Sequence, residues 1–137
     1  MKLNIVSMLS SLFFLASCGP SMEDANNVVG LHVISDFGSD YTYVSEAPDH
    51  IEISNTVKRL DWQKGFHQVI LVTAPGVSME VGGSLDPSDG LSSVYRDINK
   101  SIYRVTVDPP ISVDQMEKIL LSFHAGDNQW GKMYKYE

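Results

Sequence analysis

The clearest pattern along the chain is a series of short apolar segments between residues 68 and 107. Residues 68–73 form a continuous apolar run, as expected for a central strand. Apolar and polar positions then alternate in residues 77–81 and 103–107, which predicts strands with one buried face and one face in water. Residues 91–95 supply another strand between them, and the connections are short. The pattern predicts a four-stranded antiparallel meander.

A helical pattern follows at residues 112–125. Ser112 and Gln115 match a capping box, Ile111 and Met116 are spaced for a hydrophobic staple, and Gly126 suits the end of the helix. The predicted buried stripe consists of Val113, Met116, Ile119, Leu120 and Phe123.

The earlier part of the domain predicts shorter elements. We expect strands at residues 28–34 and 41–44, a short strand at 50–54, and a helix at 55–62 that Ser54 or Asn55 caps. Residues 133–136 predict a final strand. The expected fold class is therefore α+β, an antiparallel sheet of about 4–6 strands with two helices packed on one face.

The first residues have a different character from this domain. Lys2 precedes an apolar run over residues 5–15, which is too short to cross a membrane and is typical of a signal peptide. The run ends in Leu15-Ala16-Ser17-Cys18, which resembles the lipobox of bacterial lipoproteins. The resemblance implies cleavage before Cys18 and a diacylglyceryl group on its sulfur.

This reading divides the chain into three parts. We expect a signal peptide at residues 1–17, a lipidated cysteine with a flexible tether of about 30 Å at 18–27, and one domain at 28–137. The implied location is the cell envelope. Because Gly19 rather than Asp follows the cysteine, the resemblance favours the periplasmic face of the outer membrane in a Gram-negative cell.

The charge and the cysteine content limit the classes of molecule that this protein is expected to bind. The formal net charge is −7, and Lys2 is the one charged residue of the signal segment, so the rest of the chain is more acidic still. An acidic surface disfavours nucleic acid and suits solubility or a basic protein partner. The single cysteine, Cys18, leaves no internal disulfide, and lipidation accounts for it.

The longest interruption of the meander is the stretch 82–90. It lacks the Lys and Ser/Thr of a phosphate-binding loop, and Asp86 and Asp89 lack the alternating ligands of an EF-hand. A structural loop and a recognition loop both remain open, and an acidic loop on a rigid sheet is a suitable place for a partner contact.

We find no catalytic pattern. The histidines are scattered without metal-ligand spacing, and no serine hydrolase motif occurs. Glu80 and Asp97 fall on positions that the alternation assigns to solvent. We therefore expect no enzyme activity, no cofactor and no metal site.

Residues 79–97 and 108–130 resemble the small immunity proteins of bacterial polymorphic and contact-dependent toxin systems. The likeness rests on Gly82-Gly83 after a strand and on Gly126-Asp127 and Trp130 after a late helix. Many such immunity domains are cytoplasmic, so the lipobox would fit a toxin met in the periplasm or at the membrane.

The sequence therefore predicts a lipid-anchored envelope protein that acts by binding a protein, with a toxin as one specific partner. The alternative is an envelope lipoprotein with a structural or assembly role. The predicted partner-binding residues are Glu80, Asp86, Asp89, Asp97 and Trp130.

Overall fold

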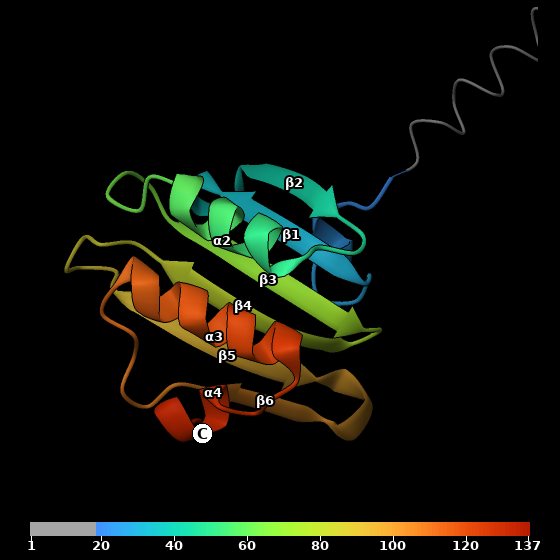
Figure 1. The fold of residues 1–137 in the computed structure, drawn as a ribbon. Coiled ribbons are helices and arrows are strands. Elements are labelled where there is room, and N and C mark those ends of the chain that lie inside the picture. The colour runs from blue at the N-terminus through green and yellow to red at the C-terminus, as the bar shows by residue number, and fades with distance from the viewer. Residues whose placement is uncertain (1–18) are drawn as a thin grey trace, which may run out of the picture.

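The computed structural model describes residues 19–137, which form a six-stranded antiparallel sheet with two main helices (Figure 1). This confirms the α+β prediction. The strand order is β2-β1-β3-β4-β5-β6, in which β3 to β6 are the predicted meander and β1 and β2 form a hairpin. The strands are β1 (Gly30–Ser35), β2 (Asp40–Ser45), β3 (His67–Ala74), β4 (Val77–Gly83), β5 (Leu91–Asp97) and β6 (Ile102–Val105).

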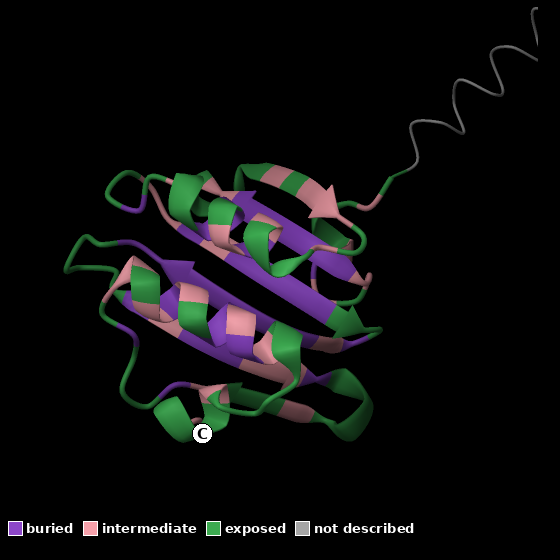
Figure 2. Ribbon diagram, viewed as in Figure 1, coloured by how far each residue is buried: buried purple, intermediate pink, exposed green. Residues whose placement is uncertain are grey.

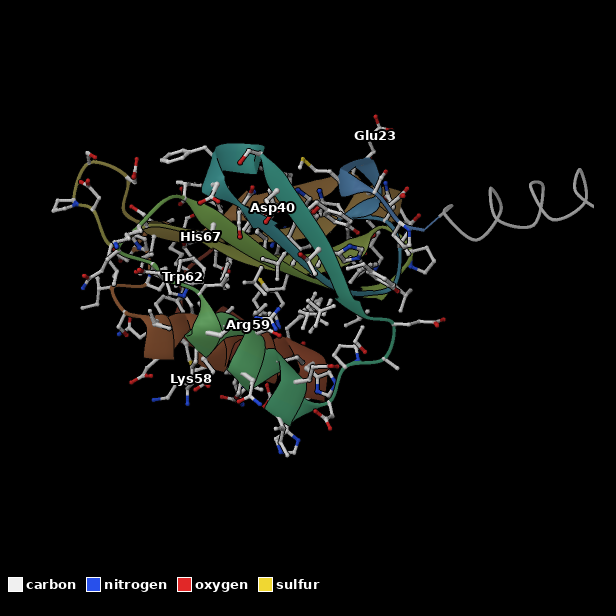
Figure 3. The ribbon with its side chains drawn as sticks, turned by 90° about the horizontal axis from the view of Figure 1, so that it is seen from above. Glu23, Asp40, Lys58, Arg59, Trp62 and His67 are labelled. Atoms are coloured by element: carbon white, nitrogen blue, oxygen red, sulfur yellow. The ribbon has the colours of Figure 1, made fainter. Side chains whose placement is uncertain are left out.

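The helices α2 (His50–Arg59) and α3 (Val113–Ala125) lie side by side on the same face of the sheet (Figures 1 and 3). Both contribute to the main core, together with the sheet residues that point toward them, such as Leu31, Leu71 and Met79. Short turns of helix complete the fold: η1 (Met22–Asp24), η2 (Asp36–Gly38), η3 (Ile98–Lys100) and α4 (Trp130–Met133). None of the helices in the described part of the chain is long and apolar enough to span a membrane.

The predicted start and end of α3 are confirmed, but only one of the two hydrogen bonds of the predicted capping box forms. The Ser112 hydroxyl accepts a hydrogen bond from the Gln115 N–H, and Gly126 takes the left-handed conformation at the C-terminus. The predicted staple is wrong, because Ile111 is 78% exposed while Met116 is fully buried. The Ile111 N–H donates instead to the Gln115 side chain at 2.8 Å.

The prediction of a strand at residues 50–54 is also wrong. The helix α2 begins there, because the Asp49 carboxylate accepts the Glu52 N–H at 2.8 Å and so caps the first turn. Ile53 and Val57, one helical turn apart, are buried, whereas Ile51 is exposed. The α2 helix also ends at Arg59, earlier than predicted.

The sheet is buried on both faces, which the alternation did not predict. Ser78 and Glu80, expected in water, are 0% and 6% exposed, and Asp97 is 6% exposed. Figure 2 shows the same burial along the four inner strands, while β2 and β6 are more open.

The N-terminal segment covers this second face, which corrects the expectation of a flexible tether at residues 18–27. Residues 21–29, the N-terminal strap, lie on the face of the sheet opposite α2 and α3, toward the end where the chain enters the domain (Figure 3). Ala25 is 1% exposed and packs with Ile34, Ile70 and Val72 in a second, smaller core. The domain therefore begins before residue 28. Cys18 and the predicted signal peptide lie outside the described residues.

The C-terminal prediction is partly wrong. Residues 133–136 do not form a strand: α4 occupies Trp130–Met133, and a single bridge joins Tyr136 to Thr106. The Tyr136 hydroxyl donates to Ser93 Oγ at 3.0 Å, and burial raises the pKa of this phenol to about 12. The tail thus ends packed against β5 and β6.

Candidate functional site

The β4–β5 loop, residues 84–90, is built by its own hydrogen bonds. Ser84 Oγ donates to the Asp89 carboxylate at 2.8 Å and accepts the Asp86 N–H at 3.1 Å. The Asp86 carboxylate in turn accepts the N–H and the hydroxyl of Ser88, each at 2.9 Å. These bonds hold the pKa of Asp86 below its usual value, so its charge persists in mildly acidic solution.

The same loop is attached to the rest of the domain. The Leu85 N–H donates to the Trp62 carbonyl at 2.7 Å, and the Ser84 N–H donates to the Gly90 carbonyl at 3.0 Å. Gly83 has a φ of +119°, and a side chain there would collide with the Gly90 main chain. The loop therefore has a fixed conformation, and Gly83 and Gly90 allow the close main-chain contact on which this conformation depends.

A shallow groove lies between this loop and the connection from β6 to α3. Its volume is about 230 Å³, and its apolar walls include Leu85, Pro87, Leu91, Pro109, Pro110 and Ile111. Leu85 is 39% exposed and Ile111 is 78% exposed, so the groove presents apolar side chains to solvent.

The groove has a negative border. Residues 84–90 and 106–112 contain Asp86, Asp89 and Asp108 and no Lys or Arg. All three aspartates are exposed. An apolar groove with carboxylates around it can bind a segment that combines an apolar side chain with a basic one.

The structure places the other predicted contact residues elsewhere. Glu80 is on β4, where its carboxylate pairs with Arg96 at 3.0 Å and accepts from Gln68 at 3.0 Å. Asp97 accepts the Lys100 N–H and so caps η3. Both are buried, and we assign them structural roles.

Trp130 belongs to an aromatic cluster on the helix side of the sheet. Its ring lies 4.9 Å from that of Tyr95 and 5.1 Å from that of Tyr136, measured between centroids, and the main-chain N–H of Trp130 donates to Ser122 Oγ at 2.9 Å. The five predicted contact residues therefore do not form one site. Only Asp86 and Asp89 lie together in the loop, and Ile111, which completes the groove, was missed because the staple pattern assigned it to packing.

Three of the four histidines are used to hold main-chain segments in place. In each of them Nε2 forms a hydrogen bond to a main-chain carbonyl. His32 bonds Val28, His67 bonds both Asp61 and Lys64, and His124 bonds Pro48. Within residues 19–137, no group of three or more His, Cys, Asp and Glu side chains could hold a metal ion.

The two ends of the sheet differ in what they hold. The β4–β5 loop and the β6–α3 connection lie at one end, and the strap enters the domain at the other (Figures 1 and 3).

Comparisons with known proteins identify no relative, since no family model, curated protein or solved structure matches this chain.

Proposed function

We propose that this protein is a lipid-anchored envelope protein that acts by binding another protein at the groove. The observation that carries the proposal is the position of the groove. It lies at the end of the domain opposite the point where the strap enters, and the strap begins three residues after Cys18 (Figure 1). The lipobox supports a lipid on Cys18, processing by a signal peptidase and an envelope location.

The partner we propose is a protein that presents an apolar side chain next to Lys or Arg. Leu85 and Ile111 supply the apolar contact, and Asp86 and Asp89 supply the charge. The prearranged loop favours binding, because little conformational entropy is lost when the partner docks. A toxin that acts in the envelope is one such partner, and the immunity-protein resemblance supports it.

The test uses two matched pairs of charge-neutralised variants. Asp86→Asn with Asp89→Asn removes the negative border of the groove and keeps an acceptor oxygen for Ser84 and Ser88. Asp40→Asn with Glu46→Gln removes two exposed carboxylates away from the groove. The wild-type protein and both variants are used to capture envelope proteins, and each captured protein is then titrated in purified form.

The proposal predicts that the loop variant binds the captured partner about tenfold more weakly, with a weaker salt dependence, while the control variant binds normally. If the partner is a toxin, co-expression of the wild-type protein restores growth and the loop variant protects less. Equal binding by all three proteins would contradict the groove. A cell-wall defect on deletion, without any partner at the groove, would favour the structural role instead.

A further inference from the structure

The strap begins very close to the predicted lipid site. Ser21 starts it, and its N–H and hydroxyl both donate to the Asp24 carboxylate, the N–H at 2.9 Å. Only Gly19 and Pro20 separate Ser21 from Cys18. A chain of this length spans at most about 10 Å, a third of the length expected for a free tether.

The strap is also fixed to the sheet along its length. The Val28 carbonyl accepts from His32 Nε2 at 2.7 Å, and the Val29 carbonyl accepts the Tyr43 hydroxyl at 2.6 Å. The Asn26 side chain accepts from Arg96 at 3.0 Å. Because these bonds attach the strap rigidly to the sheet, the position of Ser21 relative to the membrane also determines the position of the whole domain.

Three exposed apolar side chains occur at the end where the strap enters. Met22 of η1 is 38% exposed, Ile51 in the first turn of α2 is 58% exposed, and Ile98 of η3 is 53% exposed. The η3 turn lies against the β3–β4 turn, because the Asn99 side chain donates to the Pro75 carbonyl at 3.0 Å. The alternating strand directions bring these elements to the same end, which we call the tether end (Figure 1).

We propose that the tether end is a membrane-facing surface that lies on zwitterionic lipid, with the groove directed away from the bilayer. This inference rests on the proposed lipid anchor. The short link leaves the domain little freedom to turn, and the three apolar side chains contact the interfacial region. A strand of the length of β3 then holds the groove roughly 25 Å above the lipid.

The charge of the tether end indicates that the lipid anchor, rather than the protein surface, keeps the domain on the membrane. Apart from the buried Asp97 and the paired Arg96, the charged residues of the tether end include Glu23, Asp24, Glu46 and Asp49 on the acidic side and Lys100 on the basic side. Anionic lipid would repel these carboxylates, and three separate apolar side chains bind a bilayer weakly. The tether end therefore contacts the bilayer only when the chain is lipidated, and we expect the unlipidated chain not to bind vesicles.

The test measures the distance of two labelled positions from the membrane. Since Cys18 is the one cysteine in the sequence and carries the lipid, Lys100→Cys and Lys64→Cys each give a single free thiol for a fluorophore. Lys100 lies in η3, and the exposed Lys64 lies between α2 and β3 at the groove end. The processed proteins are reconstituted in phosphatidylcholine vesicles that contain a nitroxide-labelled lipid.

We expect quenching at position 100 to exceed quenching at position 64 by roughly threefold or more, because the length of the sheet separates them. Inserting about twelve Gly and Ser residues between Gly19 and Pro20 should reduce this difference, because a flexible linker of that length no longer restricts the domain. Ile51→Ser with Ile98→Ser should reduce quenching at position 100, and Ile111→Ser should leave it unchanged.

Equal quenching at the two positions, or stronger quenching at position 64, would overturn the membrane-facing surface. An unchanged difference after the insertion would show that the short link does not orient the domain, and would overturn the inference as well. The mass of each processed protein is measured first. A chain without lipid on Cys18 would refute the anchor itself, which separates failure of the proposed function from failure of the orientation.

Discussion

The two faces of the sheet are covered by different means. The face under α2 and α3 is apolar, with Ile53, Val57, Met116, Ile119 and Leu120 all fully buried against it. The face under the strap combines a small apolar cluster with polar groups. His32, Glu80 and Arg96 each find a hydrogen-bonding partner there.

The difference shows how each cover is held. Helices attach through the area they bury, which tolerates small changes in position. The strap attaches through hydrogen bonds at defined positions, so loss of one partner leaves a buried group unsatisfied. We expect helix-face substitutions to change global stability most, and strap-face substitutions to loosen the N-terminal segment as well.

The largest effect should follow from Ile119→Ala on the helix face. Ile119 is fully buried in the main core, and its truncation leaves a cavity. We expect a loss of about 2–5 kcal/mol in the free energy of unfolding, measured by urea denaturation. Lys118→Ala, at the adjacent exposed position, is the control and should stay within about 0.5 kcal/mol of wild type.

A smaller loss should follow from Arg96→Met on the strap face. Arg96 pairs with Glu80 and bonds Asn26, so its removal leaves a buried carboxylate with only Gln68 and removes one of the hydrogen bonds that hold the strap. We expect a loss of about 1–3 kcal/mol, together with faster amide exchange in residues 21–29.

The matched control is Lys135→Met, which breaks the Lys135–Glu137 pair. Both side chains of that pair are more than 60% exposed, at 72% and 66%, so the change should be within about 0.5 kcal/mol. A loss at Arg96 no greater than at Lys135 would contradict the structural role of the strap.

The sequence predicts the helix face better than the strap face for a physical reason. The stripe of α3 and the apolar run of β3 repeat with the period of their own element, so local spacing reveals them. The burial of Ser78 and Glu80 depends on a segment about fifty residues earlier in the chain. Alternation in β4 alone cannot show that residues 21–29 cover its polar side.

The candidate site was predictable to a similar degree. Turn residues and acids in the stretch 82–90 marked the loop, and Asp86 and Asp89 are indeed exposed there. The role of Ile111 depends on how the β6–α3 connection passes the loop, which is a tertiary feature. Asp49 as the cap of α2 was recognisable in principle, but alternating Ile51 and Ile53 favoured a strand.

The next effect should appear as a pH dependence from His32. Its Nε2–H donates to the Val28 carbonyl at 2.7 Å, and its Nδ1 lies 2.8 Å from the Tyr41 hydroxyl, which can donate to it when the ring is neutral. Burial lowers the pKa of His32 from its ordinary value of 6.5. The unfolded chain therefore takes up a proton more readily than the folded one.

The difference between the pKa of His32 in the folded and the unfolded chain sets the direction in which stability changes with pH. Stability from the neutral ring is present above pH 6.5 and decreases as the pH falls from there toward the lowered pKa. We expect the urea midpoint of the wild-type protein to fall over that window and the fall to be smaller in His32→Gln. His50→Gln, at an exposed position, should keep the wild-type pH profile, and an identical profile for His32→Gln would contradict the assignment.

The smallest effect on stability should come from Asp86→Asn with Asp89→Asn. Both side chains are exposed and the amides keep an acceptor for Ser84 and Ser88, so the free energy of unfolding should change by less than about 0.5 kcal/mol. A large loss of stability would mean that these carboxylates serve the loop rather than a partner.

The proposals for the groove and for the tether end together require that a protein partner docks at the groove end, away from the membrane. Site-specific photo-crosslinking in intact cells tests it most directly, with the crosslinking amino acid placed at Ile111 in the groove or at Ile51 at the tether end, both exposed. We expect one discrete protein adduct from position 111, lost when Asp86→Asn and Asp89→Asn are combined, and no such adduct from position 51. A protein adduct from position 51 alone, or none from position 111, would contradict it.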